Sequence, residues 1–150
     1  MSDMRIAVLG AAGRMGQALT SALYATPGCE IAGGLETAGS PLIGRDLGEI
    51  AGLEPIGIPV TDDPHALFAH VEGVLDFTVP DATTELVALA AQARIVHVIG
   101  TTGFKADQLA KIDAASRHAT IVKAGNMSMG CLLYTSPSLR DQRPNLVCRL

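Results

Sequence analysis

The chain has 150 residues, of which 48% are hydrophobic and 17% are charged, a composition typical of one folded domain. Its net charge of -4 disfavours nucleic acid as the main partner, because binding to phosphates needs a basic surface. No apolar run approaches the roughly 18 residues of a membrane span and no signal-peptide pattern opens the chain, so we expect a cytoplasmic protein that binds no membrane.

The first 35 residues predict one β-α-β unit. Residues 5–10 form a short apolar run that ends in glycine, which is typical of a strand buried on both faces. Residues 14–25 predict a helix that ends before Pro27, and residues 29–35 predict the second strand. We expect the buried side of this helix to carry Met15, Leu19, Ala22 and Leu23.

Glycine and proline interrupt residues 37–61, and we expect a long surface loop there with one short helix. Asp62 and Asp63, followed by Pro64, indicate the start of another helix. The remaining expected elements are strands at 73–77, 95–99 and 120–123 and helices at 80–94 and 104–116. This alternation predicts an α/β fold, a Rossmann-like doubly wound parallel sheet with helices on both faces.

Cysteine and histidine spacing does not indicate a metal site. The three cysteines lie far apart, at positions 29, 131 and 148, which fits neither a disulfide framework nor zinc binding. The four histidines, at positions 65, 70, 97 and 118, also lack ligand spacing, and we expect each to be an ordinary surface or core residue.

A glycine-rich loop lies between the first predicted strand and helix. Backbone N–H groups at a helix start, together with the helix dipole, bind a pyrophosphate. Gly10 permits the tight turn, Gly13 lets a phosphate approach the backbone, and Gly16 lets the helix pack closely on the strand. The candidate cofactor-binding residues of this loop are Gly10, Ala11, Ala12, Gly13, Arg14, Met15 and Gly16.

Glu36 follows the second predicted strand, about 20 residues after the loop, where an acidic group is expected to bond the adenosine ribose. The alternative is an exposed carboxylate without a ligand, and the glycine loop at the matching distance favours the binding role.

Three polar segments, 77–80, 100–104 and 124–128, also follow predicted strands. Ligands of open parallel sheets lie beyond the carboxyl ends of the strands, so we expect these segments to converge on the cofactor cleft. Hydroxyl and amide groups for a nicotinamide ring or a substrate carboxylate come from Thr101, Thr102, Asn126 and Ser128.

The order and spacing of these motifs over residues 5–130 resemble the 4-hydroxy-tetrahydrodipicolinate reductase (dihydrodipicolinate reductase) family of bacterial lysine biosynthesis. Besides the glycine loop and Leu35-Glu36, the matching segments are Asp76-Phe77-Thr78, Val98 to Phe104 and Gly125 to Gly130. The resemblance implies hydride transfer from NADH or NADPH to a cyclic dicarboxylate with loss of water. It also implies a separate domain for substrate binding and assembly into a homotetramer.

The resemblance assigns roles to individual residues. Gly10 to Gly16 would hold the pyrophosphate and Glu36 the ribose, and Thr102 would also reach the substrate. The residues that would line the nicotinamide end are Phe77, Thr78, Gly100, Thr101, Thr102, Gly125, Asn126, Met127 and Ser128.

Thr37 departs from the family pattern, because many members carry arginine directly after the ribose-binding acid. A carboxylate without a cationic neighbour repels the extra phosphate of NADP, so we expect a preference for NADH over NADPH. Arg14 or Arg45 could compensate and allow NADPH as well.

The resemblance ends after Gly130, and the catalytic histidine and lysine of the family have no counterpart in this chain. We therefore expect a dinucleotide-binding domain over residues 1–130 that lacks the substrate and tetramerisation domain and does not turn over. We interpret residues 131–150 as a tail foreign to the family, such as a translated sequencing adapter, with a natural divergent terminus as the alternative.

Two other functions remain open at the level of sequence. One is a stand-alone dinucleotide-binding module such as a redox sensor, for which we find no effector segment or basic helix. The other is a different Rossmann dehydrogenase, which fold alone does not exclude. The segment from Ile99 to Phe104 argues against that second alternative.

Overall fold

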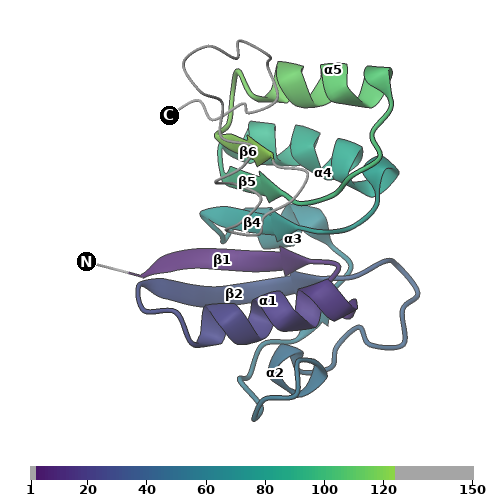
Figure 1. Ribbon diagram of the computed structural model, residues 1–150. Coiled ribbons are helices and arrows are strands. Elements are labelled where there is room, and N and C mark those ends of the chain that lie inside the picture. The colour runs from purple at the N-terminus through teal and green to yellow at the C-terminus, as the bar shows by residue number, and fades with distance from the viewer. Residues whose placement is uncertain (1–2, 124–150) are drawn as a thin grey trace, which may run out of the picture.

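Six parallel strands form one sheet in the order β3-β2-β1-β4-β5-β6 in the computed structural model, which describes residues 3–123 (Figure 1). The strands are β1 Met4–Leu9, β2 Cys29–Leu35, β3 Val60–Thr61, β4 Gly73–Asp76, β5 Val96–Ile99 and β6 Ile121–Lys123. The helices are α1 Arg14–Tyr24, α2 Leu47–Ile50, α3 Pro64–Phe68, α4 Pro80–Ala93 and α5 Ala106–Ala115. The Rossmann-like parallel fold predicted from the sequence is confirmed.

Two sequence-based expectations were wrong. The first concerns residues 37–61, where Val60–Thr61 forms strand β3 and pairs with Gly34 and Leu35 of β2. The second concerns α1, because Met15 is 50% exposed and Ala22 also faces solvent. Gly16, Thr20 and Leu23 are buried in their place, so the buried stripe of α1 is rotated from the one expected.

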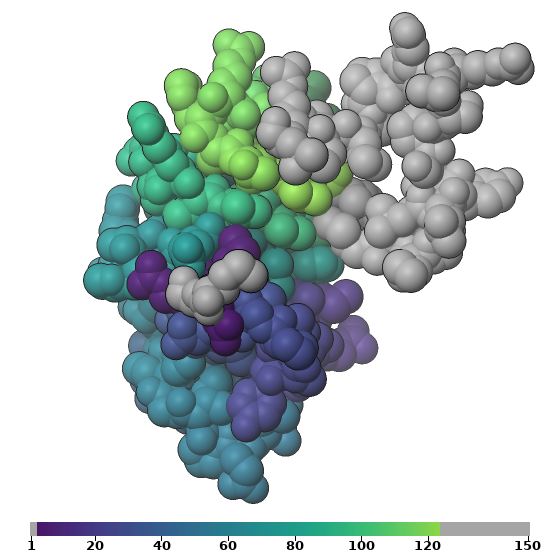
Figure 2. Space-filling model, turned by 90° about the vertical axis from the view of Figure 1, so that its left-hand side faces the viewer, coloured from purple at the N-terminus to yellow at the C-terminus, as the bar shows by residue number. Residues whose placement is uncertain are grey.

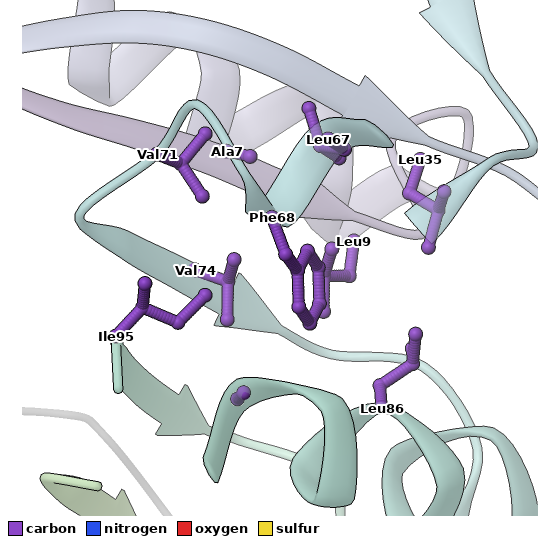
Figure 3. Packing of buried hydrophobic residues seen from close by; sticks show 10 residues of the cluster. Ala7, Leu9, Leu35, Leu67, Phe68, Val71, Val74, Leu86 and Ile95 are labelled. Carbon is purple, nitrogen blue, oxygen red and sulfur yellow. The ribbon is translucent and has the colours of Figure 1, made fainter. Parts of the chain in front are cut away.

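The helices cover both faces of the sheet, as a doubly wound fold requires. On one face, α1 and α2 pack over β1, β2 and β3 through a cluster that includes Val8, Leu23 and Leu47. On the other face, α3 and α4 pack through a cluster centred on Phe68, whose ring points toward Leu9 and Val74 (Figure 3). A third cluster joins α4 and α5 to β5 and β6. In the space-filling view, the purple and blue segments that include β1 and β2 lie directly against the teal and green segments that follow them in the chain (Figure 2).

Strand order reverses between β1 and β4, which are neighbours in the sheet although β2 and β3 separate them in the chain. The connections after β1 and β4 therefore leave the sheet in opposite directions and open a crevice at its carboxyl edge. This crevice positions the candidate site.

Some expectations lie outside the residues that the structure describes. They concern Gly125, Asn126, Met127 and Ser128 and the tail at 131–150. Between Asp3 and Lys123, no helix is long and apolar enough to cross a membrane.

Candidate functional site

The glycine loop after β1 is tied to the end of β2. Gly10 has a φ of 71°, a conformation in which glycine is strongly favoured. The backbone N–H groups of Gly10 and Ala11 both donate to the Leu35 carbonyl, at 2.9 and 3.1 Å. These bonds place the loop beside the residues that follow β2, as the sequence predicted.

Gly16 is required by close packing within the loop. A Cβ atom at this position would lie 2.1 Å from the Gly10 carbonyl oxygen and 2.8 Å from Ala11 Cα. No side chain fits there, so Gly16 lets the first turn of α1 rest directly on the loop. Ala11 is fully buried beneath it, and its N–H group is already bonded to Leu35.

The first backbone N–H groups of α1 are available to bind a ligand. Gly13 is the N-cap in an extended conformation, no side chain caps the helix, and no acidic residue lies in its first turn. The first N–H groups of a helix have no partner within it, and the positive end of the helix dipole adds to their field. This 11-residue helix therefore offers an anion site at Arg14 and Met15, where the sequence predicted the pyrophosphate.

Glu36 contacts the glycine loop directly. Its Oε1 atom accepts a hydrogen bond from the Ala12 N–H at 2.8 Å, and its Oε2 atom accepts from the Thr37 N–H at 3.3 Å. The carboxylate is thus held next to the anion site by the loop itself. Loop and acid are 24 residues apart in sequence and bonded in the fold.

A cleft of about 640 Å³ runs along this edge of the sheet, from the end of β2 to the start of α4. Six of the predicted residues line it, namely Gly10, Ala12, Gly13, Glu36, Phe77 and Thr78. The other lining residues are Leu35, Thr37, Asp62, Pro64, Val79, Ala82, Glu85 and Leu86. The cleft wall thus combines both halves of the sheet, as expected at a switch point.

All charged residues that line the cleft are acidic: Glu36, Asp62 and Glu85. Arg45 is not among the lining residues, and its guanidinium lies 3.9 Å from the Glu49 carboxylate on the exposed side of α2. Sequence reasoning missed Asp62 as a cleft residue, because it follows the strand that was not predicted. It also missed Glu85, for which the helical pattern gave no signal.

Buried polar groups connect the loops after β4 and β5. Asp76, the last residue of β4, is fully buried, and its Oδ1 atom accepts from the backbone N–H and the hydroxyl of Thr78 at 3.0 and 2.6 Å. The Oδ2 atom lies 3.0 Å from His97 Nε2 on β5. An ionised carboxylate only accepts hydrogen bonds, so Nε2 carries the proton. His97 was expected to be an ordinary residue, and the strand register that brings its side chain within reach of Asp76 was not visible in sequence.

Opposing effects set the pKa of Asp76. Burial by itself raises the pKa, whereas the hydrogen bonds from His97 and Thr78 lower it. The hydrogen bonds prevail, and the pKa lies below the ordinary value of 3.8. Asp76 is therefore a buried anion near neutral pH.

The predicted residues after β5 differ in their exposure. The Thr101 hydroxyl points inward, where it accepts from Thr83 at 3.0 Å and lies 3.5 Å from Asp76 Oδ1. Gly100 lies against the Phe77 ring, which a Cβ atom would approach to 2.0 Å. Thr102 is exposed. None of these three residues lines the cleft described above.

A second hollow of about 570 Å³ lies between α4 and α5. Arg94, Lys111 and His118 contribute to its wall, and much of the rest is alanine. It lacks a glycine loop and a helix N-terminus, so it is the weaker candidate for a dinucleotide. Within the described part of the chain, no group of three or more His, Cys, Asp or Glu side chains could hold a metal ion.

A family model described as dihydrodipicolinate reductase, N-terminus, matches residues 4–127. The chain belongs to the dihydrodipicolinate reductase family. It is 58% identical over 129 residues to the 4-hydroxy-tetrahydrodipicolinate reductase of Sinorhizobium fredii, covering 86% of this chain and 47% of that protein. It is 54% identical over 135 residues to the Chelativorans reductase of the same name, covering 90% and 49%. The chain thus spans about half the length of these family members.

Solved structures agree with this family assignment. A dipicolinate-bound dihydrodipicolinate reductase from Paenisporosarcina matches with a TM-score of 0.69 at 26% identity, covering 87% of this chain and 50% of that one. An amine dehydrogenase from Mycobacterium smegmatis matches with a TM-score of 0.67 at 21% identity, covering 81% and 38%. The second likeness supports the fold alone.

Proposed function

We propose that residues 1–130 form the dinucleotide-binding domain of a 4-hydroxy-tetrahydrodipicolinate reductase that uses NADH in preference to NADPH. One observation carries the proposal. The carboxylate of Glu36 accepts a hydrogen bond from the N–H of Ala12, so the acid for which we propose the ribose-binding role lies beside an uncapped helix N-terminus. The names of the relatives supply the substrate class.

The residues present fit a nicotinamide dinucleotide. The N–H groups at the start of α1 would hold the pyrophosphate, which can approach closely because Gly13 has no side chain. Glu36 would hold the adenosine ribose. Phe77 and Thr78, across the switch point, would border the nicotinamide half. The remaining predicted contacts, at 100–102 and 125–128, belong to the same proposal, with Thr102 also reaching substrate.

When bound, the cofactor supplies the hydride for reduction. The chain's own residues would orient it, and the Phe77 ring, which lies against Gly100, forms part of the cleft wall. The matched residues 4–127 correspond to the N-terminal part of the family, and the resemblance assigns proton donation and substrate binding to a separate domain. We propose that residues 1–130 bind the cofactor, and that the whole reductase is a cytoplasmic homotetramer.

The acidic wall of the cleft supports the preference for NADH. A 2′-phosphate would add about two negative charges next to Glu36, with Asp62 on the same wall. Arg14, the first residue of α1, is not among the residues that line the cleft. Thr37 supplies no charge at the position where the family often has arginine. Like charges at close range in a partly enclosed site are unfavourable.

A parallel fluorescence titration with NADH and NADPH tests this preference. We expect NADH to bind at least about tenfold more tightly, which corresponds to about 1.4 kcal/mol. Glu36→Gln should weaken the binding of NADH and bring the dissociation constants of NADH and NADPH closer together. Asp62→Asn should bring the two constants closer together without weakening the binding of NADH. Equal dissociation constants in the wild type would refute the preference, and failure of both nucleotides to bind would refute the proposed function.

A further inference from the structure

We propose that Asp76 is a positioning residue that holds the loops after β4 and β5 in the arrangement required by the nicotinamide half of the cofactor. The inference rests on the proposed function. It concerns one polar network, made of the buried residues Asp76, Thr83, His97 and Thr101 and the partly buried Thr78. No member of this network was singled out by sequence for such a role.

The network joins separate elements at the carboxyl edge of the sheet. Asp76 ends β4, and its strand partner Ile99 ends β5, so the following loops start side by side. Thr78 lies in the first loop and Thr101 in the second. Thr83 comes from the first turn of α4 and lies 3.0 Å from the Thr101 hydroxyl and 3.2 Å from that of Thr78. The Asp76 carbonyl adds a bond at 2.8 Å to the N–H of Gly100.

The hydroxyl donors of this network lead to the carboxylate, either directly or through a neighbouring hydroxyl. Thr78 donates to Asp76 directly, and Thr83 donates to Thr101, which in turn donates to Asp76. Each threonine hydroxyl has a single proton, so these bonds use all three. His97 provides the donor on the opposite side, at Oδ2. A buried anion that gathers this many donors fixes the loops more strictly than a neutral acceptor would.

Thr78 connects this network with the wall of the cleft. With its hydroxyl turned inward, Thr78 directs its Cγ2 methyl toward Gly10, where a Cβ atom would lie 3.0 Å from it. Phe77 and Val79, on either side of Thr78, line the cleft. Movement of Thr78 would therefore shift the wall opposite the glycine loop. Glu36 and the start of α1 are outside the network and would stay in place.

This division predicts an effect confined to one half of the cofactor. ADP-ribose carries the adenosine, pyrophosphate and second ribose of NADH but lacks the nicotinamide. Asp76→Asn should raise the dissociation constant of NADH about tenfold and change that of ADP-ribose less than about twofold. Glu36→Gln should weaken both ligands, because both carry the adenosine ribose.

Two neighbouring threonines of α4 provide a matched test that spares the buried charge. Thr83 and Thr84 are both buried, but the Thr84 hydroxyl bonds the Pro80 carbonyl of its own helix at 2.6 Å. Thr83→Val should weaken NADH several-fold relative to ADP-ribose, Thr83→Ser should restore binding, and Thr84→Val should have no selective effect.

Calorimetric titration of the 150-residue chain with both ligands decides between the outcomes. Selective loss of NADH affinity in Asp76→Asn and Thr83→Val supports the proposal. Equal loss of both ligands, or no loss in either variant, overturns it and leaves the cofactor proposal standing. If Asp76→Asn fails to fold, the comparison of Thr83→Val with Thr84→Val decides alone. A wild-type chain that binds neither ligand overturns the proposed function and this inference together.

Discussion

At the scale of residues, Gly16 and Gly13 of the loop after β1 have different roles: the first allows close packing, and the second leaves room for a ligand. A Cβ atom at Gly16 would meet backbone atoms at 2.1 and 2.8 Å, whereas at Gly13 the nearest atom, the Gly10 carbonyl oxygen, would be 3.3 Å away. Gly13 also has an extended backbone that alanine adopts freely. The fold thus restricts the residue at position 16 to glycine, whereas the proposed phosphate restricts the residue at position 13.

Substitution of these glycines should therefore have different effects. We expect Gly16→Ala to lower the free energy of unfolding by at least the roughly 1–3 kcal/mol typical of overpacked sites. Gly13→Ala should lower it by no more than about 1 kcal/mol, the scale of an N-cap change, yet weaken NADH more than tenfold. Urea denaturation and NADH titration of both variants measure this contrast. Equal destabilisation, or unimpaired binding in a folded Gly13→Ala, would contradict it.

The buried carboxylate of Asp76 makes a further prediction, on pH. A carboxyl whose pKa is lower in the folded protein stabilises the fold above its unfolded pKa, and this contribution is lost as the pH falls through the folded value. The ordinary pKa is 3.8, and that of Asp76 is lowered. The difference in unfolding free energy between wild type and Asp76→Asn should therefore be constant above about pH 5 and shrink below about pH 4. Urea denaturation across this range would detect it, and a difference that stays constant down to pH 3 would be contrary to expectation.

At the scale of elements, the sequence predicted those that carry an apolar run or a helix-start signal, and it missed strand β3, which has neither. The expected strand at 29–35 and the helix starts at Pro64 and Pro80 agree with the structure. Strand β3 has only two residues and directly follows Pro59, so it carries no alternation to recognise. Its pairing with β2 creates it, and the cleft residue Asp62 was missed for the same reason.

Asp46 organises the segment that looked like an open loop. Its carboxylate accepts hydrogen bonds from five backbone N–H groups, those of Gly48, Glu49, Ile56, Gly57 and Ile58. Hydrogen bonds led by that from Ile56 hold the pKa of Asp46 below its ordinary value, although burial opposes them. One side chain therefore caps α2 and also fixes the return toward β3.

Loss of this carboxylate should loosen the segment locally. In Asp46→Ala we expect faster amide hydrogen exchange at 48–49 and 56–58, with the amides of β1 unchanged. Asp63 provides the control, because it accepts only from His65 and Ala66 at the start of α3. Asp63→Ala should affect that turn alone. Exchange at 48–58 equal to that of the wild type would show that other contacts hold the segment.

At the scale of the whole molecule, the glycine loop, the doubly wound parallel sheet and the family could all be predicted, because each has a local signature or a fixed spacing. The network around Asp76 could not, because it depends on the register of β4 against β5 and on one turn of α4. The acidic character of the cleft depends likewise on side chains from the residue after β2, the β3–α3 connection and α4. Such sites depend on how the strands are connected and aligned, which the periodicity of a sequence does not reveal.

The most direct test of the central claim is a map of NADH-induced amide chemical shifts on the isotopically labelled chain. We predict changes at 10–16, at Glu36 and at 77–79, along the cleft between the first strand and the first half of α4. Shifts confined to the basic hollow around Arg94, Lys111 and His118 would contradict it, because phosphate attraction alone would then explain the binding.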